Sequence, residues 1–160
     1  MRFLFLAALV ALPSTASAQL RISVGAGAGL SGSTDESLSY GTGAPVVMGE
    51  IVRPFLPGIG LGAEVDYWKG TVSHVAFATA LAQAHIPVIP LYFKAGLGYG
   101  NGDPDGNGNV AGLAGQLGAM YDITFPGAPV ALTVFANALY AHARLRSVQT
   151  VDAGLAITWR

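Results

Sequence analysis

The ionisable residues best placed for chemistry lie in short segments whose apolar and polar residues alternate. Glu64 and Asp66 are two positions apart, so in a strand their carboxylates lie on one face. Because a buried charge without a partner is very costly, we expect the charges on such faces to pair if the faces are buried together. The pattern predicts a salt-bridged structural network, with a gate or narrow conduction path as the alternative. The members of the predicted network are Glu64, Asp66, Lys94, Asp122 and Asp152, with Arg21 contributing near one end.

A polar segment with oxygen-bearing side chains at alternate positions looks like the first half of a calcium-binding loop. The residues are Asp103, Asp105, Asn107 and Asn109. A complete EF-hand loop places a bidentate Glu at its twelfth position, and Ala114 occupies that position here. Asp, Asn, Gly and Pro also favour ordinary turns. We predict a polar turn, with weak calcium binding as the alternative, and we expect no other metal site and no cofactor.

Two arginines form a basic spot in the last polar connection of the chain. Arg144 and Arg146 lie close to His142, and guanidinium groups match the geometry of phosphate. Contact with lipid phosphates is therefore one interpretation, beside ordinary solvated loop charge.

The histidines give weak support for hydrolysis. His74 follows Ser73, and His142 precedes Ser147 by five positions. A Ser/His/acid set requires these groups to meet in space, which sequence spacing alone does not provide. We predict a protein that is not an enzyme, with a lipid-modifying enzyme kept as an alternative.

The N-terminal residues have the order of a secretory signal peptide. Arg2 precedes ten apolar residues, 3–12, and Ala16-Ser17-Ala18 forms a small-residue cleavage site. Ten apolar residues are too few for a membrane-spanning helix, which needs about 20. We predict that residues 1–18 are removed and that residues 19–160 form one exported domain.

The composition excludes several classes of protein. Apolar residues make up 52% of the 160 residues and charged residues 11%, which is incompatible with intrinsic disorder. The net charge of -1 gives no basic footprint for nucleic acid. The absence of cysteine excludes a disulfide framework and a thiolate metal site.

Alternation with a period of two residues predicts an all-β fold of eight strands. The proline-rich connections alternate with longer polar ones, as in an up-and-down meander. A helix over residues 75–93 is the alternative for one stretch, but Pro87 and Pro90 oppose it. The expected strands lie near residues 20–30, 46–53, 59–68, 71–84, 91–100, 113–123, 129–141 and 151–159.

The distribution of aliphatic and polar residues favours a barrel that spans a membrane. Apolar-out, polar-in strands of about ten residues are typical of outer-membrane barrels, and a bilayer forces such a sheet to close. Aromatic residues near both strand ends agree with this, although a soluble sandwich is the alternative; they are Tyr67, Tyr99 and Tyr140 at one end and Phe55, Tyr121, Phe125 and Trp159 at the other.

The chain resembles the small OmpA/OmpX-like outer-membrane β-barrel proteins over essentially all of residues 19–160. The residues that carry this resemblance are segments 92–100, 115–121 and 151–159, and Trp159 fits the family's C-terminal aromatic residue, although Arg160 follows it. The resemblance implies an eight-stranded antiparallel up-and-down transmembrane barrel in the cell outer membrane, with outer-membrane lipids and the barrel-assembly machinery as partners. The motifs themselves say little about function. Our leading hypothesis is a structural or surface-interaction role in which loops 31–45 and 101–109 face outside and offer a place for an extracellular ligand; a narrow solute pore is an alternative.

Overall fold

The fold is taken from a computed structural model, which describes residues 20–34, 38–40, 43–71, 74–86, 88–103, 108–142 and 147–160. The predicted signal peptide, residues 1–18, lies outside these ranges. Within them, no helix is long and apolar enough to cross a membrane.

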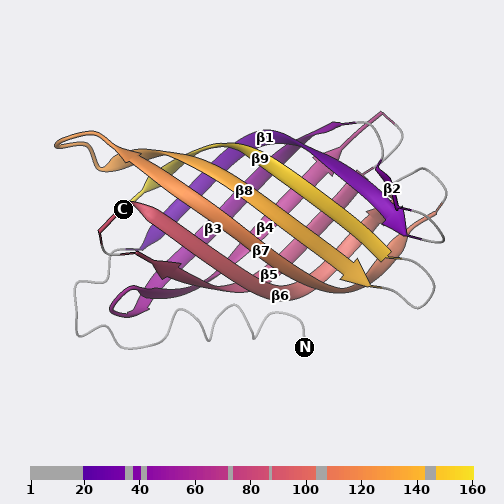
Figure 1. Cartoon of the computed structure of the whole chain (residues 1–160), viewed down its shortest axis with the longest axis horizontal. Helices are drawn as coiled ribbons and strands as arrows, with labels where there is room; N and C mark the ends of the chain where they lie inside the picture. The colour runs from indigo at the N-terminus through magenta and orange to yellow at the C-terminus, as the bar shows by residue number, and fades with distance from the viewer. Residues whose placement is uncertain are drawn as a thin grey trace.

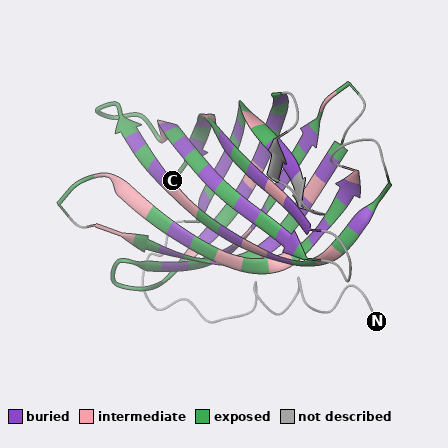
Figure 2. Cartoon of the chain, turned by 45° about the vertical axis from the view of Figure 1, so that its right-hand side comes forward, coloured by how far each residue is buried: buried purple, intermediate pink, exposed green. Residues whose placement is uncertain are grey.

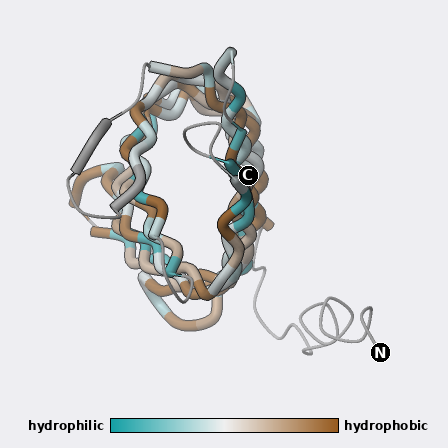
Figure 3. The backbone as a smooth tube through the Cα atoms, turned by 90° about the vertical axis from the view of Figure 1, so that its right-hand side faces the viewer, coloured by the Kyte–Doolittle hydropathy of each residue, from teal (hydrophilic) through white to brown (hydrophobic). Residues whose placement is uncertain are grey.

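The described chain forms one antiparallel sheet that closes on itself (Figure 1). Each long strand pairs with the next one along the chain, and β1 also pairs with β9, from Ile22↔Trp159 to Thr34↔Ser147. Viewed along its length, the chain is a closed ring (Figure 3). The strands are β1 (Arg21–Thr34), β2 (Leu38–Tyr40), β3 (Ala44–Leu56), β4 (Ile59–Lys69), β5 (His74–His85), β6 (Leu91–Asp103), β7 (Val110–Thr124), β8 (Val130–His142) and β9 (Ser147–Trp159).

Eight long strands close the barrel, which confirms the predicted fold class, but the strands are longer than their apolar patterns. The short strand β2 pairs with the end of β1 inside the predicted loop 31–45. Strands β6, β8 and β9 likewise extend into the predicted polar connections. The difference arises because ladder hydrogen bonds are made by backbone groups and do not require apolar side chains. The helical alternative for residues 75–93 is wrong, since β5 and β6 pair across this stretch.

Compact turns join the strands at one end of the barrel. Gly58 and Gly127 adopt φ values of 75° and 76° there, a left-handed conformation that glycine reaches without steric cost. His85 donates its backbone N–H to the carbonyl of Gly58 over 2.7 Å, which ties two neighbouring turns together. We call this end, which also carries Arg160, the turn end, and the opposite end the loop end.

Buried and exposed residues alternate along most of each long strand (Figure 2). On β4, Glu64, Asp66 and Trp68 are buried, whereas Val65 and Tyr67 are exposed. The most exposed aliphatic residues include Leu97 at 77% and Leu113 at 79%. The aromatic residues expected near the two ends are also exposed on the outer surface. The apolar face is therefore the outer one, as the sequence predicts.

Inward-facing glycines allow neighbouring backbones and interior aromatic rings to approach closely. A Cβ added at Gly25 would lie 2.9 Å from Cε1 of Phe135, and one at Gly100 would lie 2.8 Å from Cε1 of Phe77. At Gly98 the added atom would meet the backbone carbonyl of Ala78 on β5. Outward-facing Gly115, in contrast, has open space where its Cβ would be.

We expect Gly98→Ala to destabilise the barrel by about 1–3 kcal/mol, because the backbone of β5 must move to admit the methyl group. Gly115→Ala is the matched control on the neighbouring strand and is expected to change the free energy of unfolding by less than about 0.5 kcal/mol. Urea titration of the refolded protein in detergent, followed by tryptophan fluorescence, measures both. Equal effects at the two positions would contradict the assignment of the inner face.

Candidate functional site

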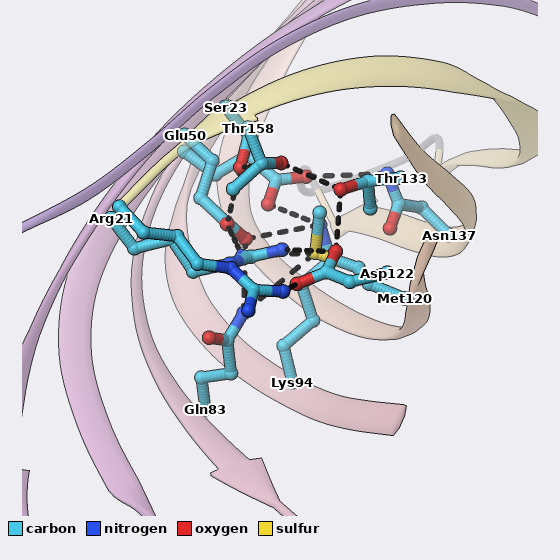
Figure 4. Close-up of polar contacts among 12 residues, drawn as sticks. Arg21, Ser23, Glu50, Gln83, Lys94, Met120, Asp122, Thr133, Asn137 and Thr158 are labelled. Carbon is cyan, nitrogen blue, oxygen red and sulfur yellow. Dashed lines mark hydrogen bonds and ion pairs between the residues drawn. The ribbon is translucent and has the colours of Figure 1, made fainter. Parts of the chain in front are cut away.

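The barrel interior contains a network of charged and polar side chains from most of the long strands (Figure 4). Near the turn end, Arg21 of β1 contacts two carboxylates. Its Nη1 lies 2.5 Å from Oε1 of Glu50 on β3, and its Nη2 lies 3.1 Å from Oδ1 of Asp122 on β7. One guanidinium thus links strands that are far apart in the sequence.

Lys94 is a wholly buried cation inside the described barrel. Its Nζ forms an ion pair with Oε2 of Glu64 and lies 3.6 Å from Oε2 of Glu50. The other oxygen of Glu64 accepts hydrogen bonds from Gln116 at 2.5 Å and from Asn137 at 3.2 Å. Such charge-assisted contacts are what makes a buried carboxylate tolerable.

Asp122 is the second well-paired carboxylate. It accepts hydrogen bonds from the Thr133 hydroxyl and from Nη2 of Arg160, each at 2.5 Å. Arg160 follows the outward Trp159, so the alternation of β9 directs its side chain inward. A chain of hydroxyl contacts completes this region, with Thr133–Thr158 at 2.6 Å and Ser23–Thr158 at 2.9 Å.

The structure thus brings together only part of the charge set expected from the sequence. Glu64 contacts Lys94, and Asp122 contacts Arg21. Asp66 and Asp152 are buried, at 0% and 2% exposure, but among the described residues neither has a hydrogen-bond partner.

Sequence reasoning missed Glu50 as a member of the network. Its strand β3 has the apolar residues Met48 and Val52 at the neighbouring inward positions, so its inner face does not look polar. The signal that could have identified Glu50 is its position in the alternation: it shares a face with Met48 and Val52, opposite the exposed Val47 and Ile51.

Apolar side chains pack against one another inside the barrel, beside the polar network. Most of them lie toward the loop end, where Trp68, Phe77 and Val75 are each 1% exposed. Phe135 continues this cluster toward the middle of the barrel. We call this set the apolar plug, and its large members are Val46, Met48, Trp68, Val75, Phe77, Met120, Phe135, Leu139 and Val148. The interior is thus filled by two kinds of packing, ionic toward the turn end and apolar toward the loop end.

The remaining candidate residues lie at the loop end or outside the described residues. Asp105, Asn107, Arg144, Arg146 and Ser73 belong to the second group. Asp103 is the last residue of β6, and Asn109 directly precedes β7.

The histidine at the end of β8 has an aromatic neighbour. The His142 ring stacks on Tyr140 with centroids 6.3 Å apart, and His142 is the register partner of Ser147. Within the described part of the chain, no group of three or more His, Cys, Asp and Glu side chains is arranged to hold a metal ion.

Two solved outer-membrane proteins share this fold. One is Ail, the attachment invasion locus protein of Yersinia pestis, solved with the heparin analogue sucrose octasulfate; the TM-score is 0.63 at 15% identity, over 88% of this chain and 99% of that chain. The other is Neisserial surface protein A, with a TM-score of 0.60 at 13% identity, over 86% of this chain and 96% of that chain. No protein-family model and no curated protein sequence matches the chain.

The class of protein follows from the fold and the exterior together. The fold is that of small outer-membrane β-barrels, which confirms the resemblance to OmpA/OmpX-like proteins at the level of the fold. An apolar outer face on a closed sheet is suited to a lipid bilayer and not to water. The expected location in an outer membrane is supported by both observations.

Proposed function

We propose that the protein is a non-enzymatic outer-membrane barrel with a structural or surface-interaction role carried by its extracellular loops. The observation that supports this most is the filled interior. The ion pairs of Lys94 fill one part of the lumen, and the apolar plug fills the part nearer the loop end. An eight-stranded barrel is only wide enough for side chains to fill it. The loop end is then the part that meets molecules outside the cell.

The orientation in the membrane follows from the same proposal. Loops 31–45 and 101–109 face outside, and the turn end, where the barrel's chain begins and finishes, faces the periplasm. Outer-membrane lipids surround the exposed aliphatic residues. The barrel-assembly machinery acts on β9, whose aromatic Trp159 is exposed on the outer face.

The proposed ligand is an anionic group at the cell surface, contacted by Arg144 and Arg146. Guanidinium groups bind phosphate and similar oxyanions through paired hydrogen bonds. The similar fold of Ail, solved with a heparin analogue, supports a sulfated saccharide as the first probe. The weak calcium loop at Asp103, Asp105, Asn107 and Asn109 remains a separate hypothesis.

The double variant Arg144→Ser/Arg146→Ser is expected to bind heparin at least tenfold more weakly than the unaltered protein. Each hydrogen bond to a charged group contributes about 1.5–3 kcal/mol, and about 1.4 kcal/mol corresponds to tenfold in affinity. Surface plasmon resonance of proteoliposomes over immobilised heparin gives the comparison. Arg53→Ser, at the turn end of β3, is the control and should leave binding unchanged; equal binding by all three proteins would refute the assignment.

A lipid-modifying enzyme and a narrow pore remain the alternatives. His142 and Ser147 are register partners, so loss of envelope-lipid remodelling in Ser147→Ala would favour the enzyme. Steady single-channel current from the unaltered barrel in a planar bilayer would favour the pore.

A further inference from the structure

The buried charges of the described barrel do not balance. Five carboxylates are buried, namely Glu50, Glu64, Asp66, Asp122 and Asp152, whereas Arg21 and Lys94 are the buried cations. Arg160 adds a third cation by reaching Asp122 from the turn end. With all five carboxylates ionised, the interior carries an excess of two negative charges.

The excess lies at two identifiable side chains. Glu50, Glu64 and Asp122 each contact a cation. In the described structure, both carboxylate oxygens of Asp66 and both of Asp152 lack a hydrogen-bond donor. Asn137, the register partner of Asp152, interacts with both Asp152 and Glu64, but it is a neutral amide and brings no positive charge to Asp152. Since a buried unpaired carboxylate is very costly, each of these two groups must be neutralised, either by a proton or by a bound cation.

Asp66 and Asp152 belong to one region of the lumen. Each interacts electrostatically with Lys94, and Asp66 also interacts with Asp152. Trp68, two residues beyond Asp66 on the same face of β4, extends toward Asp152. Its Cη2 lies 2.5 Å, and Cβ of Asp152 lies 2.7 Å, from the point that a Cβ on Gly29 would occupy.

Two further buried polar groups in this region lack partners among the described residues. Thr150 is 1% exposed, lies two residues before Asp152 on the same inward face of β9, and has no partner for its Oγ1. Trp68 Nε1 lacks an acceptor. Of the eight buried side-chain atoms without a partner, six are oxygens. The excess of acceptor oxygens calls for a cation or for proton donors, and oxygen atoms are the ligands that hard divalent cations take.

We propose that the lumen binds one hard divalent cation, of the Ca²⁺ or Mg²⁺ class, between Asp66 and Asp152, with the Thr150 hydroxyl as a third ligand. Two carboxylates alone do not enclose a metal ion, and such cations commonly retain water ligands. A metal-bound water then supplies the acceptor that Trp68 Nε1 lacks. The site sits between the Lys94 network and the apolar plug, and it is independent of the role proposed for the loops.

The chain permits a direct test because Trp68 is adjacent to the proposed site. The probe is Tb³⁺, which takes oxygen ligands as Ca²⁺ does and luminesces when a nearby excited indole transfers energy to it. Trp159→Phe leaves Trp68 as the only tryptophan, so this variant is refolded from urea with Tb³⁺. We expect sensitised luminescence that Ca²⁺ displaces, and at least a tenfold loss of signal when Asp66→Asn and Asp152→Asn are added. Unchanged luminescence in that triple variant would overturn the proposal.

Two controls separate the lumen from other cation sites. Asp103→Asn, added to Trp159→Phe, alters the predicted calcium loop and should leave the signal intact; loss of the signal there would place the cation in the loop and overturn the proposal. If the triple variant does not refold, equilibrium dialysis of the Asp103→Asn protein against Ca²⁺ decides the question. One tightly bound ion per barrel is expected, whereas none would mean that protons neutralise Asp66 and Asp152.

Discussion

Replacing Lys94 by methionine is expected to destabilise the barrel by about 3–5 kcal/mol, the usual cost of removing one partner from a buried ion pair. Lys94 contacts both Glu64 and Glu50. Its loss leaves Glu64 with two amide donors, Gln116 and Asn137, and no cation within contact. The measurement is the free energy of unfolding from a urea titration of the refolded protein.

The matched control for this variant is Lys69→Met, which removes an exposed lysine at the loop end of β4. A change below about 0.5 kcal/mol is expected there. Adding Glu64→Gln to Lys94→Met should restore part of the stability, because the two residues are in contact and their effects are not additive. If Lys94→Met and Lys69→Met had the same small effect, the ionic network would not be stabilising the barrel.

Replacing Trp68 by alanine is expected to cost about 3–5 kcal/mol, as for other large aromatic residues removed from a packed interior. The indole is 1% exposed and extends from β4 toward Gly29 on β1. Its removal leaves a void that glycine positions on β1 do not fill. The same urea titration, supported by the temperature at which the folded band disappears in gel electrophoresis, measures the loss.

Trp159→Ala provides the comparison for Trp68→Ala, since Trp159 is 46% exposed on the outer face. We expect a much smaller loss there, because the removed ring leaves space that lipid chains fill. A larger loss at Trp159 than at Trp68 would show that the apolar plug contributes little to stability.

Which face of each strand points outward could be predicted from the sequence, because it depends only on the local alternation of aliphatic and polar residues. A period of two residues separates the faces, and the aliphatic side chains fall on one of them in each regular segment, as in residues 59–67 of β4. The bilayer then fixes which face points outward. In the structure, the aliphatic residues lie on the exposed outer face of β1, β4, β6, β7 and β9, as predicted.

The contacts within the lumen could not be predicted because they depend on register across several strands. Lys94 and Glu64 lie two strands apart, on β6 and β4, and meet through the length of the lysine side chain. Glu50 lies between apolar residues on the inner face of β3, and Arg160 lies beyond the last strand, so neither residue stands out in the sequence. Asp66 lies two residues from Glu64 on the same face of β4, yet in the described structure the cation pairs with Glu64 and not with Asp66.

We infer that the aliphatic side chains face lipid, while the ion pairs and Trp68 face the lumen. Fluorescence quenching by phospholipids with brominated acyl chains tests it directly, using Trp68→Phe and Trp159→Phe as single-tryptophan proteins in liposomes. Trp159, exposed on the outer face, is expected to be strongly quenched in the first variant, and Trp68 is expected to be protected in the second. Strong quenching of Trp68 together with protection of Trp159 would contradict the account.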